Sequence, residues 1–111
     1  MTMTEESQLG PSQDGTVLLD IGGDVGALVI ETPAELVGLE IELSRAGAQM
    51  PRTHVAVRER VGSGTTRYAA VYPSLRAGEY TIWGVDDEPA GTVCIVGGTV
   101  AELNWEADLP G

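Results

Sequence analysis

The segment from Tyr68 to Trp105 constrains the fold more than any other part of the chain, because its short alternating apolar runs are separated by Gly and Pro residues. Alternation of apolar and polar residues is typical of strands with one buried face. Several such runs at regular spacing, with turn residues between them, are typical of sandwiches. The sequence therefore predicts an all-β fold, a single β-sandwich of about seven to eight mostly antiparallel strands.

The chain has 111 residues, the length of one domain. Residues 1–15 are polar and carry few large apolar side chains, so we expect them to form a flexible, disordered tail. The sandwich is expected over residues 16–105, and a short C-terminal tail over 106–111. A core without disulfides is feasible for a domain of this size.

Turn residues place the strands of the first half of the chain. We predict strands at Thr16–Ile21 and Ala27–Thr32, with a Gly-rich turn between them. One helical turn is expected at Thr32–Leu36, where Pro occupies the first helical position. Alternation then predicts two further strands, Leu39–Ser44 and Thr53–Val61.

Charge pairing predicts the register of two hairpins. In the first hairpin Glu40 is expected opposite Arg58. In the second, whose turn is centred at Ser63, Glu59 is expected opposite Arg67. Opposite charges facing each other across a strand pair favour the register that brings them together.

The second half of the chain predicts a core strand and a final hairpin. Tyr80 and Ile82 alternate with polar residues and are expected to face the core. Gly97-Gly98 predicts a two-residue hairpin turn, which joins the strand ending at Val96 to the one beginning at Thr99.

The run Leu75-Arg76-Ala77-Gly78-Glu79-Tyr80-Thr81-Ile82 is followed by Val93–Gly98 and a closing strand that ends in Trp105. This order resembles the second half of carboxypeptidase regulatory-like domains. The resemblance implies a prealbumin-like sandwich, and an immunoglobulin-like topology stays open beside it. It also implies a non-enzymatic module, since such domains are typically appended to larger proteins.

The charge of the chain excludes some classes of partner. Seventeen Asp and Glu residues stand against six basic residues, and the net charge is −11. We therefore expect no nucleic acid and no membrane as partner, because a polyanion needs a cationic surface. The N-terminus lacks a basic start and an apolar run, so we expect a cytoplasmic, bacterial-type protein. Cys94 is the single cysteine and is expected to be a buried apolar residue.

Catalytic motifs are sparse. His54 is the only histidine, and no Gly-x-Ser-x-Gly nucleophile motif occurs. One His and one Cys fall short of a tetrahedral zinc site. We expect no cofactor.

Two acidic loop segments are candidates for a calcium ion. Asp86, Asp87 and Glu88 lie together between two predicted strands, and Asp20 and Asp24 flank a Gly-rich turn. Hard cations take carboxylate and carbonyl oxygens from such loops, although neither segment has EF-hand spacing. A solvated acidic loop is the other interpretation.

Aromatic residues offer a candidate ligand or interaction surface. Tyr68, Tyr72, Trp83 and Trp105 are the residues from which a platform for a carbohydrate or a peptide would be built, with His54 as a further surface candidate. The competing interpretation is that these rings belong to the core or to cross-strand pairs.

The sequence favours a non-catalytic protein-interaction or accessory module. A protein partner or self-association is expected. A protein that binds a small ligand or a calcium ion is the alternative, and an enzyme ranks third.

Overall fold

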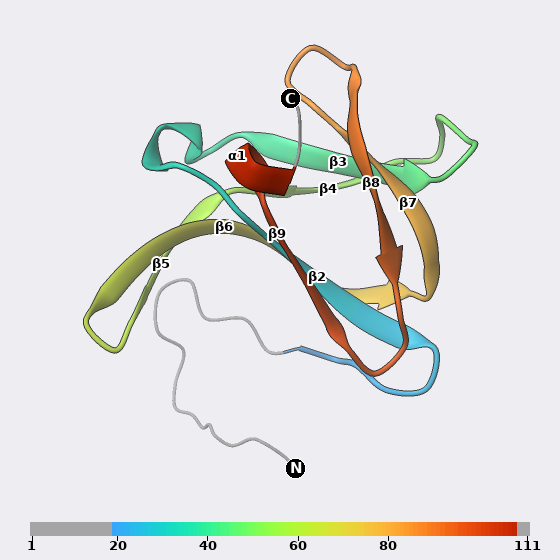
Figure 1. Cartoon of the computed structure of the whole chain (residues 1–111), viewed down its shortest axis with the longest axis horizontal. Coiled ribbons are helices and arrows are strands. Elements are labelled where there is room, and N and C mark those ends of the chain that lie inside the picture. Colours follow the sequence, from blue (N-terminus) through green and yellow to red (C-terminus); the bar gives the residue numbers. More distant parts are fainter. Residues whose placement is uncertain (1–18, 109–111) are drawn as a thin grey trace.

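The computed structural model describes residues 19–108, which form two four-stranded β-sheets arranged as a sandwich (Figure 1). The strand order is β5-β6-β2-β9 in the first sheet, called here the β2 sheet, and β4-β3-β7-β8 in the second, the β7 sheet. Neighbouring strands are antiparallel except β2 and β9, which are parallel. The predicted all-β sandwich is confirmed. Its elements are β2 (Val25–Glu31), η2 (Ala34–Leu36), β3 (Glu40–Arg45), β4 (Thr53–Ala56), β5 (Arg58–Gly62), β6 (Thr65–Arg76), β7 (Gly78–Trp83), β8 (Pro89–Ile95), β9 (Val100–Asn104) and α1 (Trp105–Asp108).

The core lies between the facing sides of the two sheets. Alternate side chains of each strand enter it, because successive residues of a strand point to opposite faces. Tyr80 and Ile82 are both buried, as the sequence predicts. The largest fully buried side chains are Leu28, Ile30, Ile41, Leu43, Val57, Ile82 and Ile95.

The predicted strand Thr53–Val61 is divided between the two sheets. β4 ends at Ala56 in the β7 sheet, Val57 is buried at the crossing, and β5 begins at Arg58 in the β2 sheet. Glu40 therefore faces Ala56 rather than Arg58, and the predicted charge pair is wrong. The alternation of side chains continues through the crossing, so the sequence gives no sign of it.

The β5–β6 hairpin is shifted by one residue from its predicted register. Ser63 and Gly64 both have positive φ, at 49° and 76°, and form a two-residue turn whose twist suits a hairpin. Arg67 consequently faces Arg60, and the predicted pairing of Glu59 with Arg67 is wrong.

The turn at Gly97-Gly98 does not close a hairpin. It carries the chain from β8 in the β7 sheet to β9 in the β2 sheet, where Val100 pairs in parallel with Ala27. A Cβ on Gly97 would lie 2.0 Å from the carbonyl oxygen of Gly23, so close backbone approach requires glycine here. The Gly-Gly pair in the sequence indicates a tight turn but does not indicate which strands the turn connects.

Cys94 is exposed, and its predicted burial is wrong. It belongs to β8, in which the neighbouring Val93 and Ile95 face the core. An uninterrupted apolar run hides this alternation, because it does not distinguish the two faces of the strand.

The remaining segments differ in smaller ways. Leu19–Ile21 lies outside any strand, and residues 16–18 of the strand predicted there fall outside the described residues, as does the predicted tail 1–15. The predicted helical turn at Thr32–Leu36 is the 3-10 turn η2. Glu106, where the predicted C-terminal tail begins, belongs to α1, and residues 109–111 are not described.

Candidate functional site

The four aromatic candidates do not gather on one surface. Tyr72 and Trp105 are buried in the core cluster, and Tyr68 is half-buried against it. Trp83 lies on the other side of the β7 sheet, because the preceding residue, Ile82, faces the core. His54 is exposed on β4, where it pairs with Glu42. Of these residues, Trp83 is the one whose ring is covered by a charged side chain, that of Arg52.

Tyr72 connects the two sheets. From β6 its hydroxyl donates to the carbonyl oxygen of Ile41 on β3, and it lies 3.4 Å from that of Thr53 on β4. Burial raises the pKa of this hydroxyl well above its usual range. Tyr72 is thus a structural member of the core with a satisfied hydroxyl.

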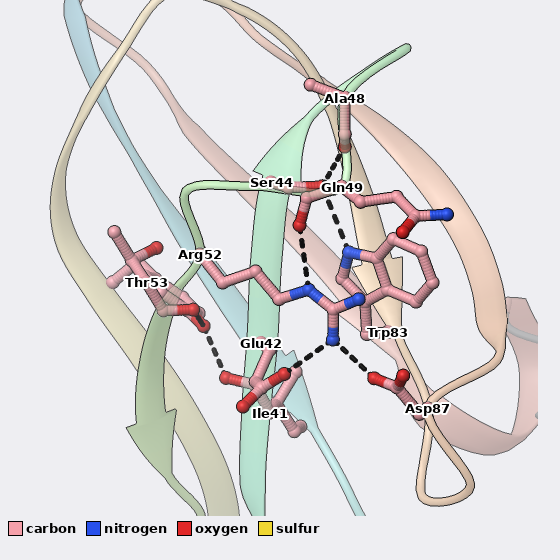
Figure 2. A network of polar contacts seen from close by, with 10 residues as sticks. Ile41, Glu42, Ser44, Ala48, Gln49, Arg52, Thr53, Trp83 and Asp87 are labelled. Atoms are coloured by element: carbon pink, nitrogen blue, oxygen red, sulfur yellow. Dashed lines mark hydrogen bonds and ion pairs between the residues drawn. The ribbon is translucent and has the colours of Figure 1, made fainter.

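Trp83 is held by Ser44 on the outer face of the β7 sheet (Figure 2). The indole N–H donates to Ser44 Oγ over 3.0 Å, and Ser44 Oγ donates to the carbonyl oxygen of Ala48 over 2.7 Å. Ser44 is only 2% exposed, so these bonds satisfy a polar group that water does not reach. The loop between β3 and β4 is thereby fixed over the sheet.

Arg52 covers the ring of Trp83 (Figure 2), with its guanidinium carbon 3.8 Å from the ring centroid. Nε donates to the carbonyl oxygen of Gln49 over 3.0 Å, and Nη1 contacts Glu42 Oε1 at 2.9 Å and an Asp87 carboxylate oxygen. The hydrogen bond to Asp87, followed by that to Glu42, raises the pKa of Arg52. Arg52 therefore joins the β3–β4 loop, strand β3 and the β7–β8 loop.

A shallow hollow of about 510 Å³ lies beside this network. Thr81 and Trp83 contribute from β7, residues 47–49 from the β3–β4 loop and residues 89–92 from β8. Because β8 is the last strand of its sheet among residues 19–108, the hollow adjoins a sheet edge that no other strand of this range covers. This arrangement is suited to receive a side chain from a strand that binds along that edge.

Each acidic loop segment places one carboxylate in an ion pair, and the other carboxylates are exposed. Asp87 has a φ of 61° and contacts Arg52, while Asp86 and Glu88 are exposed beside it. Asp24 pairs with Arg76 over 3.0 Å, and Asp20 is exposed. Between residues 19 and 108, no group of three or more His, Cys, Asp or Glu side chains is placed to hold a metal ion.

Sequence reasoning identified Trp83 and Asp87 separately and missed Ser44 and Arg52, which connect them. Ser44 appears in the sequence as a polar residue of an alternating strand, and Arg52 as one residue of a polar loop. No local pattern links Arg52 to Trp83, because they come together only when β3 pairs with β7.

No family model matches this chain, and comparison with curated proteins and with solved structures also returns no match. Within the described part of the chain, no helix is long and apolar enough to cross a membrane.

Proposed function

We infer that this protein is a non-catalytic interaction module that binds an extended, basic segment of a partner protein along the edge of β8. The observation that carries this proposal is the hollow beside Trp83, which adjoins the last strand of the β7 sheet. In strand addition, main-chain hydrogen bonds supply affinity, and pockets for alternate side chains supply specificity.

Charge supports a basic partner. The chain carries a net charge of −11, and Asp86 and Glu88 are exposed on the loop that leads into β8. Arg52, which lies over the ring of Trp83 beside the hollow, is already paired with two carboxylates and repels a basic segment little. An Arg or Lys side chain approaching the hollow therefore meets a favourable potential.

The polar groups of this site support binding rather than catalysis. The hydroxyl of Ser44 donates to Ala48, so its proton is committed to the fold. The guanidinium of Arg52 is fixed by three acceptors and the ring of Trp83. A nucleophile and a base within hydrogen-bond reach of each other are the signature of nucleophilic catalysis, and Ser44 has no such partner among the contacts described here.

A peptide titration tests this function. The probe is a fluorescein-labelled nine-residue peptide in which Arg and Val alternate, and its anisotropy is measured against increasing protein. A matched peptide with Glu in place of Arg is the control ligand. We expect the Arg peptide to bind and the Glu peptide to bind at least about tenfold more weakly, a difference of about 1.4 kcal/mol.

Two variants locate the binding site. Thr92 is exposed on β8 and lines the hollow, so Thr92→Arg should fill it and weaken binding of the Arg peptide at least about tenfold. Ser74→Arg adds the same charge at an exposed position of β6 in the other sheet and should leave binding nearly unchanged. Equal losses in both variants, or equal binding of the two peptides, would reject the proposal.

A small-ligand binder is the second candidate, because a hollow of about 510 Å³ falls within the size range of small-molecule sites. A thermal-shift screen distinguishes the two functions. Stabilisation by a small uncharged molecule, lost in Thr92→Arg, together with no peptide binding, would favour the ligand binder. Stabilisation by Ca²⁺ would instead favour the loop of Asp86, Asp87 and Glu88 as a calcium site.

A cytoplasmic location and a prealbumin-like topology, suggested by the N-terminal sequence and by the run Leu75–Ile82, remain predictions that accompany this function. Nucleic acid is not expected as a partner, because the proposed surface is acidic.

A further inference from the structure

The β5–β6 hairpin concentrates the positive charge of an acidic chain. It carries Arg58, Arg60 and Arg67, three of the six basic residues. In Figure 1 the hairpin projects from the body of the sandwich at the lower left, and its residues 61–67 are exposed. β5 is also the first strand of its sheet, so one side of it has no neighbouring strand in the part of the chain that the structure describes.

The register of the hairpin brings like charges together. Arg60 faces Arg67 directly across the ladder, an arrangement that disfavours the strand pair. Arg67 contacts Glu31 at 2.9 Å and is still mostly exposed, and Arg60 donates to the carbonyl oxygen of Ala69. Both arginines line a second shallow hollow, of about 420 Å³, near the hairpin turn. The two guanidinium groups make this end of the hairpin a positively charged surface that attracts carboxylates of another molecule.

We propose that the basic segment bound at the edge of β8 is the β5–β6 hairpin of a second copy of this chain, an inference that rests on the function proposed above. The two surfaces are complementary in charge: arginines on the hairpin, and Asp86 with Glu88 at the edge of β8. They are also complementary in backbone, since β5 and β8 both end a sheet and pair through their free sides.

Apolar side chains complete the fit. Val61 of the hairpin is 53% exposed and is the side chain that enters the hollow beside Trp83. Met50 and Val85, at 70% and 60% exposed, belong to the two loops that Arg52 joins next to this hollow. Docking of the hairpin removes part of this apolar surface from water, which favours association.

The hairpin and the edge of β8 are different surfaces in different sheets, so the contact is head-to-tail. Each copy then offers one free hairpin and one free β8 edge. Such a contact forms a ring if the rotation between copies closes, and an open chain of copies if it does not.

Complementary charge reversals test the inference in the full chain. The hairpin-reversed variant is Arg58→Glu with Arg67→Glu, and the edge-reversed variant is Asp86→Arg with Glu88→Arg. Arg45→Glu with Arg76→Glu is the control, because it changes the net charge as the hairpin-reversed variant does, at exposed positions outside the hairpin. Circular dichroism confirms folding, and light scattering after size exclusion gives the mass across a range of concentrations and salt.

The wild type and the control variant should associate at low salt and dissociate as salt rises. Each reversed variant alone should be monomeric, because the altered surface then meets one of its own sign. An equimolar mixture of the two should associate again, because both contacts between the variants join opposite charges. The native hairpin of the edge-reversed variant meets the native edge of the hairpin-reversed variant, and the reversed hairpin meets the reversed edge. The two variants should therefore alternate in assemblies that grow as those of the wild type do.

A strictly monomeric wild type, or equal losses of association in the control and in the hairpin-reversed variant, would overturn the inference. So would a mixture that stays monomeric. If the wild type is monomeric and still binds the Arg peptide at β8, the proposed function stands and only the second copy is rejected. If it associates and Thr92→Arg does not reduce the association, the contact lies elsewhere.

Discussion

The inner face of the β7 sheet and the patch formed by Ser44 and Trp83 on its outer face are both buried, and they are held by different forces. On the inner face, Leu43 and Ile82 are at most 1% exposed and contact other apolar side chains. On the outer face, the adjacent residues Ser44 and Trp83 are 2% and 7% exposed and are joined by a hydrogen bond. Apolar burial depends on volume and is not directional, whereas the outer face depends on each donor having an acceptor. Substitutions on the two faces should therefore fail for different reasons.

The largest effect is expected on the inner face. Ile82→Ala removes a side chain that is fully buried and leaves a cavity, so the free energy of unfolding should fall by about 2 to 5 kcal/mol. Urea denaturation followed by circular dichroism measures this loss. A loss below about 1 kcal/mol would mean that the inner face is loosely packed and that the contrast between the faces is wrong.

Ser44→Ala should have the next largest effect, because it leaves the indole N–H of Trp83 without its acceptor in a buried place. We expect the free energy of unfolding to fall by about 1 to 3 kcal/mol. Ser74→Ala is the matched control at an exposed position and should change it by less than about 0.5 kcal/mol. Similar losses of unfolding free energy in the two variants would show that the hydrogen bonds of the outer face contribute little to stability.

Tyr72 places a hydroxyl group among the apolar side chains of the core, and this group predicts a pH dependence of the stability. Burial raises its pKa in the folded state above the unfolded value of about 10. Its contribution to stability is therefore complete below about pH 10 and is lost as the pH rises above that value. The urea midpoint of the wild type should fall between pH 9 and pH 11 more steeply than that of Tyr72→Phe. If the urea midpoints of the wild type and of Tyr72→Phe change with pH in the same way, the hydroxyl of Tyr72 does not cause the pH dependence.

Arg52→Lys tests the stacking on the outer face. The variant keeps the charge but loses the planar group that lies over Trp83 and reaches two carboxylates. We expect a loss of about 0.5 to 1 kcal/mol in the free energy of unfolding. Arg58→Lys, at an exposed position of β5, is the control and should be nearly neutral. If Arg52→Lys does not change the free energy of unfolding, the positive charge of this residue contributes to stability and the stacking of its planar group does not.

The smallest effect is expected for His54→Ala. His54 is exposed, and the free energy of unfolding should change within about 0.5 kcal/mol. Binding of the Arg peptide should also be unchanged, because His54 does not line the hollow beside Trp83. A loss of peptide binding in this variant would extend the proposed surface to β4.

Local alternation was sufficient to predict the sandwich and the inner positions of Tyr80 and Ile82, because a strand period of two is encoded in neighbouring residues. The connections between strands are harder to predict from the sequence. The chain passes from one sheet to the other at Val57 without a break in the alternation of apolar and polar residues. Gly97-Gly98 indicates a turn but does not indicate which strands the turn connects. The network around Arg52 depends on non-local contacts, so the sequence supplied Trp83 and Asp87 without the residues that join them.

The parallel pairing of β2 with β9 has a consequence for the order of folding. Ala27 pairs with Val100, and most of the described chain lies between them. Contacts between residues so distant in sequence form slowly, because closing the long intervening loop costs entropy before the contact stabilises it. During synthesis, one side of β2 therefore has no neighbouring strand until β9 leaves the ribosome. In that interval the nascent chain exposes a strand edge on which another chain can add, and a chaperone that covers it would raise the yield of folded protein.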